Sequence, residues 1–135
     1  MPHILSDYLM DELEKAGVVK YHGYQSDMKP FYAMANCIVL PSYHEGMSNV
    51  LLEAAASGRP LITSDIPGCR EAVEDGNSGY LCPAKDANAL YGAMQRVMEL
   101  SVEQRSEMGC RGRERMEQQF SKTAVVTETI KHLEI

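Results

Sequence analysis

The chain has 135 residues, of which 13 are Lys or Arg and 19 are Asp or Glu, so its formal net charge is −6 at pH 7. A mildly acidic chain with no basic block is a poor candidate for binding nucleic acids or anionic membranes, and its length fits one domain or part of one. No apolar run approaches the roughly 18 residues of a membrane span, and the residues that follow Met1 lack the pattern of a signal peptide.

Short apolar runs alternate with helical patterns along the chain, which favours a parallel α/β sheet. In the first third, the sequence predicts a helix over 4–15 that ends at Gly17, a strand over 18–22, a helix over 27–35 and a buried strand over 37–40. The middle of the chain predicts a helix over 49–57 capped by Ser48, a strand over 61–64, a short helix over 69–74 and a strand over 79–82.

The remainder is predicted to be helical. Asp86 caps a helix with one apolar face, 103–119 forms a polar helix, and a last helix begins at Ser121. Arginines alternate with acids in the polar helix, which is typical of a solvated face, and they are Arg111, Arg113 and Arg115. We expect one domain over 1–135, a Rossmann-like α/β sheet with helices on both faces, an incomplete amino-terminal edge and a C-terminal helical tail.

Four cysteines are scattered along the chain without a C-x-x-C pair, and no His is placed to complete a zinc finger. They are Cys37, Cys69, Cys82 and Cys110. We interpret them as reduced thiols in a cytoplasmic protein, and we expect neither a metal nor a cofactor.

The stretch from 41 to 60 follows a buried strand and opens a helix, which places it at the carboxyl edge of the sheet, where open α/β sheets bind ligands. The backbone N–H groups at the start of that helix lack intrahelical partners, and they are those of Gly46, Met47, Ser48 and Asn49. With the positive end of the helix dipole, these donors form an anion site suited to phosphate.

Two glutamates flank this site. Glu45 lies in the loop before the helix, and Glu53 lies about 7.5 Å along the helix axis from the cap, at 1.5 Å per residue. Because the neighbours of Glu53 are apolar, its carboxylate needs hydroxyl or amide donors, and a vicinal diol such as that of a ribose supplies two. The spacing leaves open the alternative that both glutamates are ordinary solvated residues.

Other polar residues favour less specific roles. His44 is interpreted as a bystander, and no serine lies in a G-x-S-x-G elbow. Asp65 and Glu71 flank a turn at the same sheet edge, where roles in the turn and the helix start are favoured over lining a cleft. Tyr80, at the end of a strand, is interpreted as part of the core.

The segment from Glu45-Gly46 to Glu53-Ala54, with Gly58-x-Pro60, resembles the E-x7-E signature of retaining glycosyltransferases of family 4, which have the GT-B fold. The similarity covers about residues 18–130 and continues on both sides of the signature. The matching segments are Gly23-Tyr24, 31–35 and Leu40-Pro41-Ser42 before it, and 63–68, Glu71, Asp75-Gly76 and Gly79-Tyr80-Leu81 after it.

The resemblance implies that a nucleotide-diphosphate sugar, a UDP-sugar as is typical of the family, binds to this domain. Glu45 would contact the hydroxyls of the donor sugar as the catalytic candidate, and Glu53 would hold the ribose hydroxyls. Gln25 and Ser26 would lie near the base. The backbone facing the diphosphate and sugar would be that of Gly46, Met47, Ser48, Asn49 and Val50.

Three features of the family have no counterpart here: the N-terminal acceptor domain, the Arg and Lys that meet the diphosphate, and an Asp-x-Asp motif for a metal. We therefore expect a fragment that is inactive alone, from a bacterial, metal-independent enzyme that transfers sugar to a polysaccharide or glycolipid acceptor. The parent enzyme is expected in the cytoplasm or peripheral to the inner membrane. The alternative is a non-catalytic nucleotide-sugar-binding or interaction module that a partner chain completes.

Overall fold

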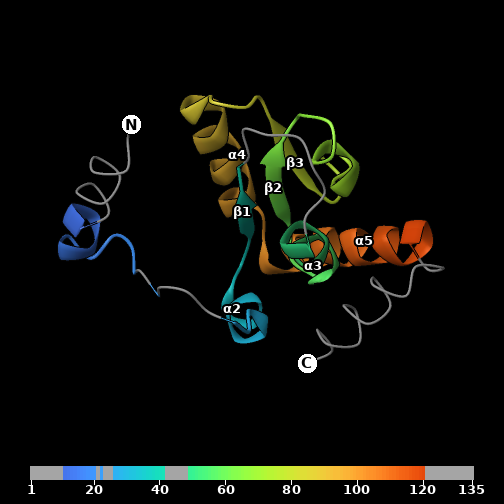
Figure 1. The fold of residues 1–135 in the computed structure, drawn as a ribbon, viewed down its shortest axis with the longest axis horizontal. Coiled ribbons are helices and arrows are strands. Elements are labelled where there is room, and N and C mark those ends of the chain that lie inside the picture. Colours follow the sequence, from blue (N-terminus) through green and yellow to red (C-terminus); the bar gives the residue numbers. More distant parts are fainter. Residues whose placement is uncertain (1–10, 21, 23–25, 42–48, 121–135) are drawn as a thin grey trace.

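The computed structural model describes residues 11–20, 22, 26–41 and 49–120, and Figure 1 shows their arrangement. In this part of the chain three parallel strands form one sheet in the order β1-β2-β3. They are β1 (Ile38–Leu40), β2 (Leu61–Ser64) and β3 (Gly79–Cys82). All four residues of β2 are buried because it lies between the other two strands.

The register of the sheet sorts side chains onto two faces. Val39 lies opposite Ile62, which lies opposite Tyr80, and these three residues belong to one apolar cluster. Ile38 and Leu61, one position earlier, belong to the other cluster. This alternation follows from the two-residue period of a strand, and burial on both faces accounts for the continuous apolar runs.

Helices cover both faces, as expected for a Rossmann-like domain (Figure 1). The helix α4 (Ala87–Glu99) places Ala93 and Val97 against Ile62. On the opposite face, the cluster around Leu61 receives side chains from α2 (Lys29–Met34), α3 (Asn49–Ala56), the 3-10 turn η1 (Arg70–Ala72) and α5 (Val102–Phe120). The three predicted strands over 37–40, 61–64 and 79–82 and the helix over 49–57 are thereby confirmed within a residue.

Three helix ends coincide with residues that cap helices well. Residues 11–15 are helical and end as predicted at Gly17, whose φ of +75° allows Val18 N–H to donate to the carbonyl of Leu13 at 3.0 Å. The predicted cap Asp86 is confirmed, since its Oδ1 accepts from Ala89 N–H at 2.9 Å. The start of α5 forms a capping box that was not predicted: Ser101 Oγ accepts from Gln104 N–H at 3.1 Å, and Gln104 Oε1 accepts from Ser101 N–H at 2.9 Å.

Two predicted elements are wrong. No strand is present at 18–20 or 22, and Val18 is 68% exposed, because a strand needs a hydrogen-bonded neighbour as well as β-branched residues. The predicted helix over 69–74 is only the single 3-10 turn of η1, since Val73 is already extended (φ −134°, ψ 133°). The described sheet accordingly has three strands where four were expected, and the last predicted helix, from Ser121, lies outside the described residues.

Although the composition of α5 is polar, one face of this helix is buried. Its buried face consists of Met108, Gly109, Gly112 and Met116. A Cβ built on Gly109 would lie 1.9 Å from the carbonyl oxygen of Gly58, so only glycine lets α5 approach the end of α3 this closely.

Two of the three arginines predicted to be solvated are docked on the loop between β2 and β3. Arg111 Nε donates to the carbonyl of Asn77 at 2.7 Å, and Arg115 Nη1 donates to the carbonyl of Glu71. Arg113 forms a helix-surface ion pair, with its Nε 3.5 Å from Glu117 Oε1. The interpretation as a solvated face is therefore wrong for Arg111 and Arg115, because the loop supplies unpaired carbonyls within reach of long side chains.

The four cysteines are free thiols, as predicted. Cys69 and Cys82 are buried, whereas Cys110 is exposed. None of the helices in the described part of the chain combines the length and the apolar character needed to cross a bilayer.

Candidate functional site

The helix α3 carries the carboxylate around which the candidate site is built. It is the next described element after β1, and its core face consists of Leu51, Ala54, Ala55 and Ala56. Glu53 lies between these buried positions and is itself half-buried. A carboxylate in such surroundings is stable only with hydrogen-bond donors nearby.

Tyr32 of α2 supplies such a donor. Its side chain is only 3% exposed and belongs to the same cluster as Leu51 and Ala54, and its hydroxyl donates to Glu53 Oε2 at 3.4 Å. The pKa of the Tyr32 hydroxyl is raised to about 12 by burial, then by the negative charge of Glu53 and by the hydrogen bond itself. The hydroxyl is therefore neutral at physiological pH and acts as a donor to the carboxylate.

The relative position of α2 and α3 is fixed by a second contact. Arg59, which follows α3, donates from Nη1 to the carbonyl of Ser57 at 3.0 Å and from Nη2 to the carbonyl of Ala33 at 3.1 Å. The planar guanidinium thus bridges the end of α3 and the turn of α2 that carries Tyr32. Tyr32 and Glu53 are held together by these contacts and by the apolar cluster between them.

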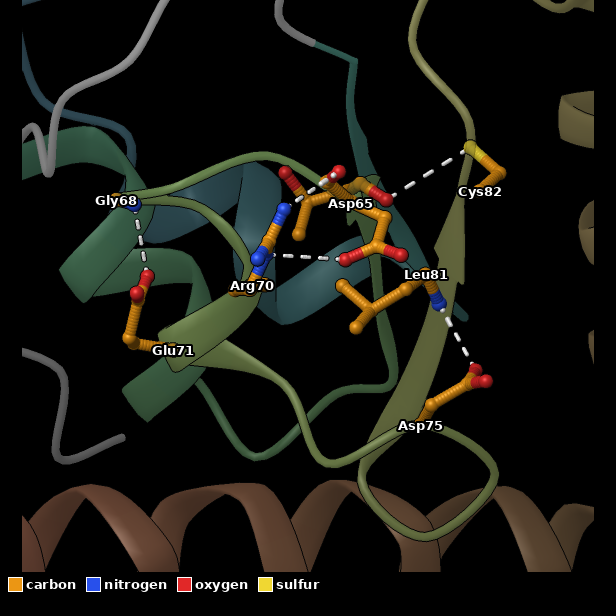
Figure 2. A network of polar contacts seen from close by, with 8 residues as sticks. Asp65, Gly68, Arg70, Glu71, Asp75, Leu81 and Cys82 are labelled. Carbon is orange, nitrogen blue, oxygen red and sulfur yellow. Dashed lines mark hydrogen bonds and ion pairs between the residues drawn. The ribbon is translucent and has the colours of Figure 1, made fainter.

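The turn after β2 forms a polar network at the carboxyl end of that strand (Figure 2). Arg70 Nε lies 3.1 Å from Asp65 Oδ1, and Glu71 Oε2 accepts from Gly68 N–H at 2.8 Å. These contacts stay within the turn and η1, which confirms the predicted turn and helix-start roles of Asp65 and Glu71. Asp75 Oδ1 accepts from Leu81 N–H at 3.0 Å and so ties the next turn to β3.

A hollow of about 220 Å³ opens at the carboxyl ends of the strands. Its walls include Pro41 after β1, Ser64 and Cys82 at the ends of β2 and β3, and Lys85 and Asp86 before α4. A larger hollow of about 380 Å³ lies beside α4 and β1, lined mainly by apolar side chains such as Val39, Met94 and Met98. Among the described residues, the lining of the larger hollow includes no carboxylate, whereas the lining of the hollow at the carboxyl edge includes Asp86.

The structure describes part of the predicted site. Glu53 is half-buried on α3, Val50 on the same helix is 45% exposed, and Asn49 is the first residue of α3. Ser26, predicted to lie near the base, is in an exposed bend. The remaining predicted residues, Gln25, Glu45, Gly46, Met47 and Ser48, lie outside the described residues.

Tyr32 and Arg59 were not predicted to support the site. Tyr32 lies in the predicted helix over 27–35, and within the segment 31–35 that carries the resemblance. The pairing with Glu53 joins residues 21 positions apart in the sequence, and no local pattern reports such a contact. Tyr80, interpreted as core, is half-buried, and the Arg96 guanidinium lies 5.8 Å from the centre of its ring.

The chain is similar to known glycosyltransferases. A family model described as "Glycosyl transferases group 1" matches residues 3–100. The lipopolysaccharide core biosynthesis glycosyltransferase LpsE of Rhizobium meliloti is 31% identical over 117 residues, which are 87% of this chain and 34% of that protein. Glycogen synthase of Mycobacterium tuberculosis is 32% identical over 130 residues, which are 91% of this chain and 31% of that protein.

Solved structures give the same fold. Sucrose-phosphate synthase of Thermosynechococcus elongatus superposes with a TM-score of 0.75 at 30% identity, covering 93% of this chain and 32% of that chain. Anabaena HepE, solved in complex with UDP, superposes with a TM-score of 0.77 at 18% identity, covering 98% of this chain and 37% of that chain. At that identity the likeness concerns the fold alone.

The fold is that of the C-terminal domain of GT-B glycosyltransferases. The chain belongs to the glycosyl transferases group 1 family. It spans about a third of the length of the curated relatives described above.

Proposed function

We propose that the chain is the donor-binding part of a retaining glycosyltransferase that takes its sugar from a nucleotide diphosphate, with UDP as the nucleotide. The observation that carries the proposal is Glu53, a half-buried carboxylate on α3 that accepts a hydrogen bond from a buried tyrosine hydroxyl, in a domain built on a parallel sheet. An open α/β sheet binds ligands at its carboxyl edge, and a carboxylate is a strong acceptor for the two hydroxyls of a ribose.

The proposed arrangement of the ligand follows the sequence analysis. Glu53 holds the ribose, the amino end of α3 from Gly46 to Val50 faces the diphosphate, and Glu45 contacts the donor sugar. Ser26 and Gln25 lie on the side of the base. The HepE structures support the choice of nucleotide, since that protein was solved in complex with UDP and with UDP-glucose.

The names of two relatives support the class of product. LpsE acts in lipopolysaccharide core biosynthesis, and CapM of Staphylococcus aureus, 31% identical over 123 residues, acts in capsular polysaccharide biosynthesis. We propose that the acceptor is a hydroxyl group of a bacterial polysaccharide or glycolipid. The transfer keeps the anomeric configuration, releases the nucleotide diphosphate and uses no metal.

We further propose that the isolated chain binds the donor without transferring sugar, because catalysis needs both reactants held in one site. Isothermal titration calorimetry with UDP and UDP-glucose tests this proposal, with the diphosphates of adenosine and guanosine as controls. We expect weak binding of UDP and UDP-glucose in preference to the purine nucleotides. The helix dipole is expected to face the diphosphate without the usual cations, so a Kd for UDP below about 1 μM would contradict this account of the site. No binding of any nucleotide would contradict the function itself.

A further inference from the structure

Tyr32 is the one donor to the Glu53 carboxylate that the structure shows among the described residues. Both side chains come from helices on the same face of the sheet, and Tyr32 is almost completely buried whereas Glu53 is half-buried. The contact therefore joins a fixed group in the core to a group that reaches the surface.

We infer that Tyr32 is a positioning residue for nucleotide recognition: its hydroxyl fixes the Glu53 carboxylate in the orientation that accepts the ribose hydroxyls. The inference rests on the proposed function and adds a residue to it. Tyr32 itself does not touch the ligand in this account, and its effect passes entirely through Glu53.

The chemistry of the two groups supports this division of roles. A carboxylate has about four lone-pair sites, so the bond from Tyr32 to Oε2 leaves Oε1 able to accept from a ligand. An unrestrained glutamate side chain has three rotatable bonds, and ordering it when a ligand binds costs conformational entropy. Because the contact with Tyr32 already orders Glu53 in the free protein, less of this cost falls on binding. The raised pKa of Tyr32 keeps its proton on the hydroxyl, which is the form that donates.

The packing around Tyr32 suits it to this role. Its ring packs in the cluster with Leu51 and Ala54 of α3, and the Arg59 guanidinium bonds to the carbonyl of Ala33, the next residue of α2. A ring that is almost completely buried has little freedom, and Arg59 holds the backbone beside it, so the position of the Tyr32 hydroxyl is well defined. Preorganisation of this kind improves affinity without any added contact to the ligand.

The experiment compares two ligands that differ only in the group that Glu53 recognises. Calorimetry is performed on the 135-residue chain with UDP and with 2′,3′-dideoxyuridine 5′-diphosphate, which lacks both ribose hydroxyls. The variant is Tyr32→Phe, which removes one oxygen and keeps the ring. The matched control is Tyr91→Phe, because Tyr91 is 63% exposed on α4 and its hydroxyl contacts only Gln95 of the same helix among the described residues.

We expect Tyr32→Phe to raise the Kd for UDP by about threefold to tenfold, the range for losing one modest hydrogen bond. The Kd for the dideoxy ligand should stay the same, and Tyr91→Phe should change neither value. In the Glu53→Ala background, Tyr32→Phe should have no further effect on UDP binding. These three results together would establish that Tyr32 acts through Glu53 on the ribose hydroxyls.

Two results would overturn the inference while leaving the proposed function intact: an unchanged Kd for UDP in Tyr32→Phe, or an equal loss for both ligands, which would mean a structural role only. If Tyr32→Phe does not fold, Tyr32→Met replaces it, since the flexible methionine side chain fills irregular core space without a hydroxyl and should show the same selective loss. An equal loss for both ligands in Tyr32→Met would overturn the inference equally. If the unmodified chain binds no UDP, the proposed function itself fails and the inference fails with it.

Discussion

Gly109 of α5 lies against the carbonyl of Gly58 so closely that an added Cβ would be 1.9 Å from that oxygen. The contact joins the long C-terminal helix to the end of the helix that carries Glu53. It also explains why α5 packs on the core despite its low apolar content. Gly109 and Gly112 of α5 have no side chains that would keep the helix away from the core.

Gly109→Ala should therefore lower the free energy of unfolding by about 1–3 kcal/mol, the usual cost of forcing extra atoms into a packed contact. Gly112→Ala is the matched control on the same helix, because its Cβ would lie 3.4 Å from the carbonyl oxygen of Ala55 and needs only a small adjustment. Urea denaturation of both variants measures the difference. Equal stabilities of the two variants would show that α5 does not pack as described.

The ionisation of Tyr32 should report its contact with Glu53 without any ligand. Its pKa is raised to about 12, with burial as the largest cause and Glu53 as the next. In Glu53→Gln the pKa should fall but stay above its ordinary value of about 10, since burial remains. Ultraviolet titration of phenolate formation, with Tyr32→Phe to identify the transition, measures both values. A Tyr32 pKa unaffected by Glu53→Gln would mean that the two groups are not in contact.

The same raised pKa makes stability depend on alkaline pH. The folded state holds the Tyr32 proton more tightly than the unfolded chain, so the stabilisation is fully present below about pH 10 and is lost as the pH rises toward about 12. Urea denaturation between about pH 9 and 11.5 should show a smaller decline in Tyr32→Phe than in the unmodified chain. Identical declines would contradict the burial of this hydroxyl.

Arg111 should stabilise the loop that precedes β3. Its Nε bonds to the carbonyl of Asn77 at 2.7 Å, and both residues are half-buried. Arg111→Ala should lower the free energy of unfolding by about 1–2 kcal/mol, since it leaves that carbonyl without its partner. Arg113→Ala removes the ion pair with Glu117 on the helix surface and should cost less than Arg111→Ala. Hydrogen exchange in residues 74–79 should accelerate in Arg111→Ala alone, and a similar acceleration in Arg113→Ala would show that the contact is not specific.

Cys37 and Cys110 should differ in their reaction with iodoacetamide. Burial raises the pKa of the Cys37 thiol to about 11, so little of the reactive thiolate forms near neutral pH, whereas Cys110 is exposed on α5. Mass spectrometry after brief labelling at about pH 8 should find the label on Cys110 and little on Cys37. Rapid labelling of Cys37 in the folded chain would contradict its position against the sheet.

Local patterns in the sequence predicted the elements that local chemistry determines. The apolar runs became β1, β2 and β3, Gly17 ended its helix, and Asp86 capped α4. The segment at 18–22 has the composition of a strand but no strand beside it, and composition alone cannot supply hydrogen-bonding partners. The docking of Arg111 and Arg115 was missed for a related reason, since the carbonyls that they bind are 34 and 44 residues away in the sequence.

The candidate site shows the same difference between local features, which the sequence predicts, and contacts between distant residues, which it does not. Glu53 was predicted from its apolar neighbours and from the helix start, both of which are local features. Tyr32 was not, because its partner is on another helix and only the packed structure brings the two together. The roles of Glu53, of Glu45 and of the backbone from Gly46 to Val50 in binding a ligand remain predictions.

The central claim is that Glu53 holds the ribose of a nucleotide diphosphate. Saturation-transfer difference NMR with UDP-glucose tests it most directly, comparing the unmodified chain with Glu53→Ala and with Glu107→Ala, an exposed glutamate on α5. The account predicts ribose signals for the unmodified chain and Glu107→Ala, and their loss in Glu53→Ala at ligand concentrations where the unmodified chain is half-saturated. Ribose signals of equal strength in all three proteins would contradict it.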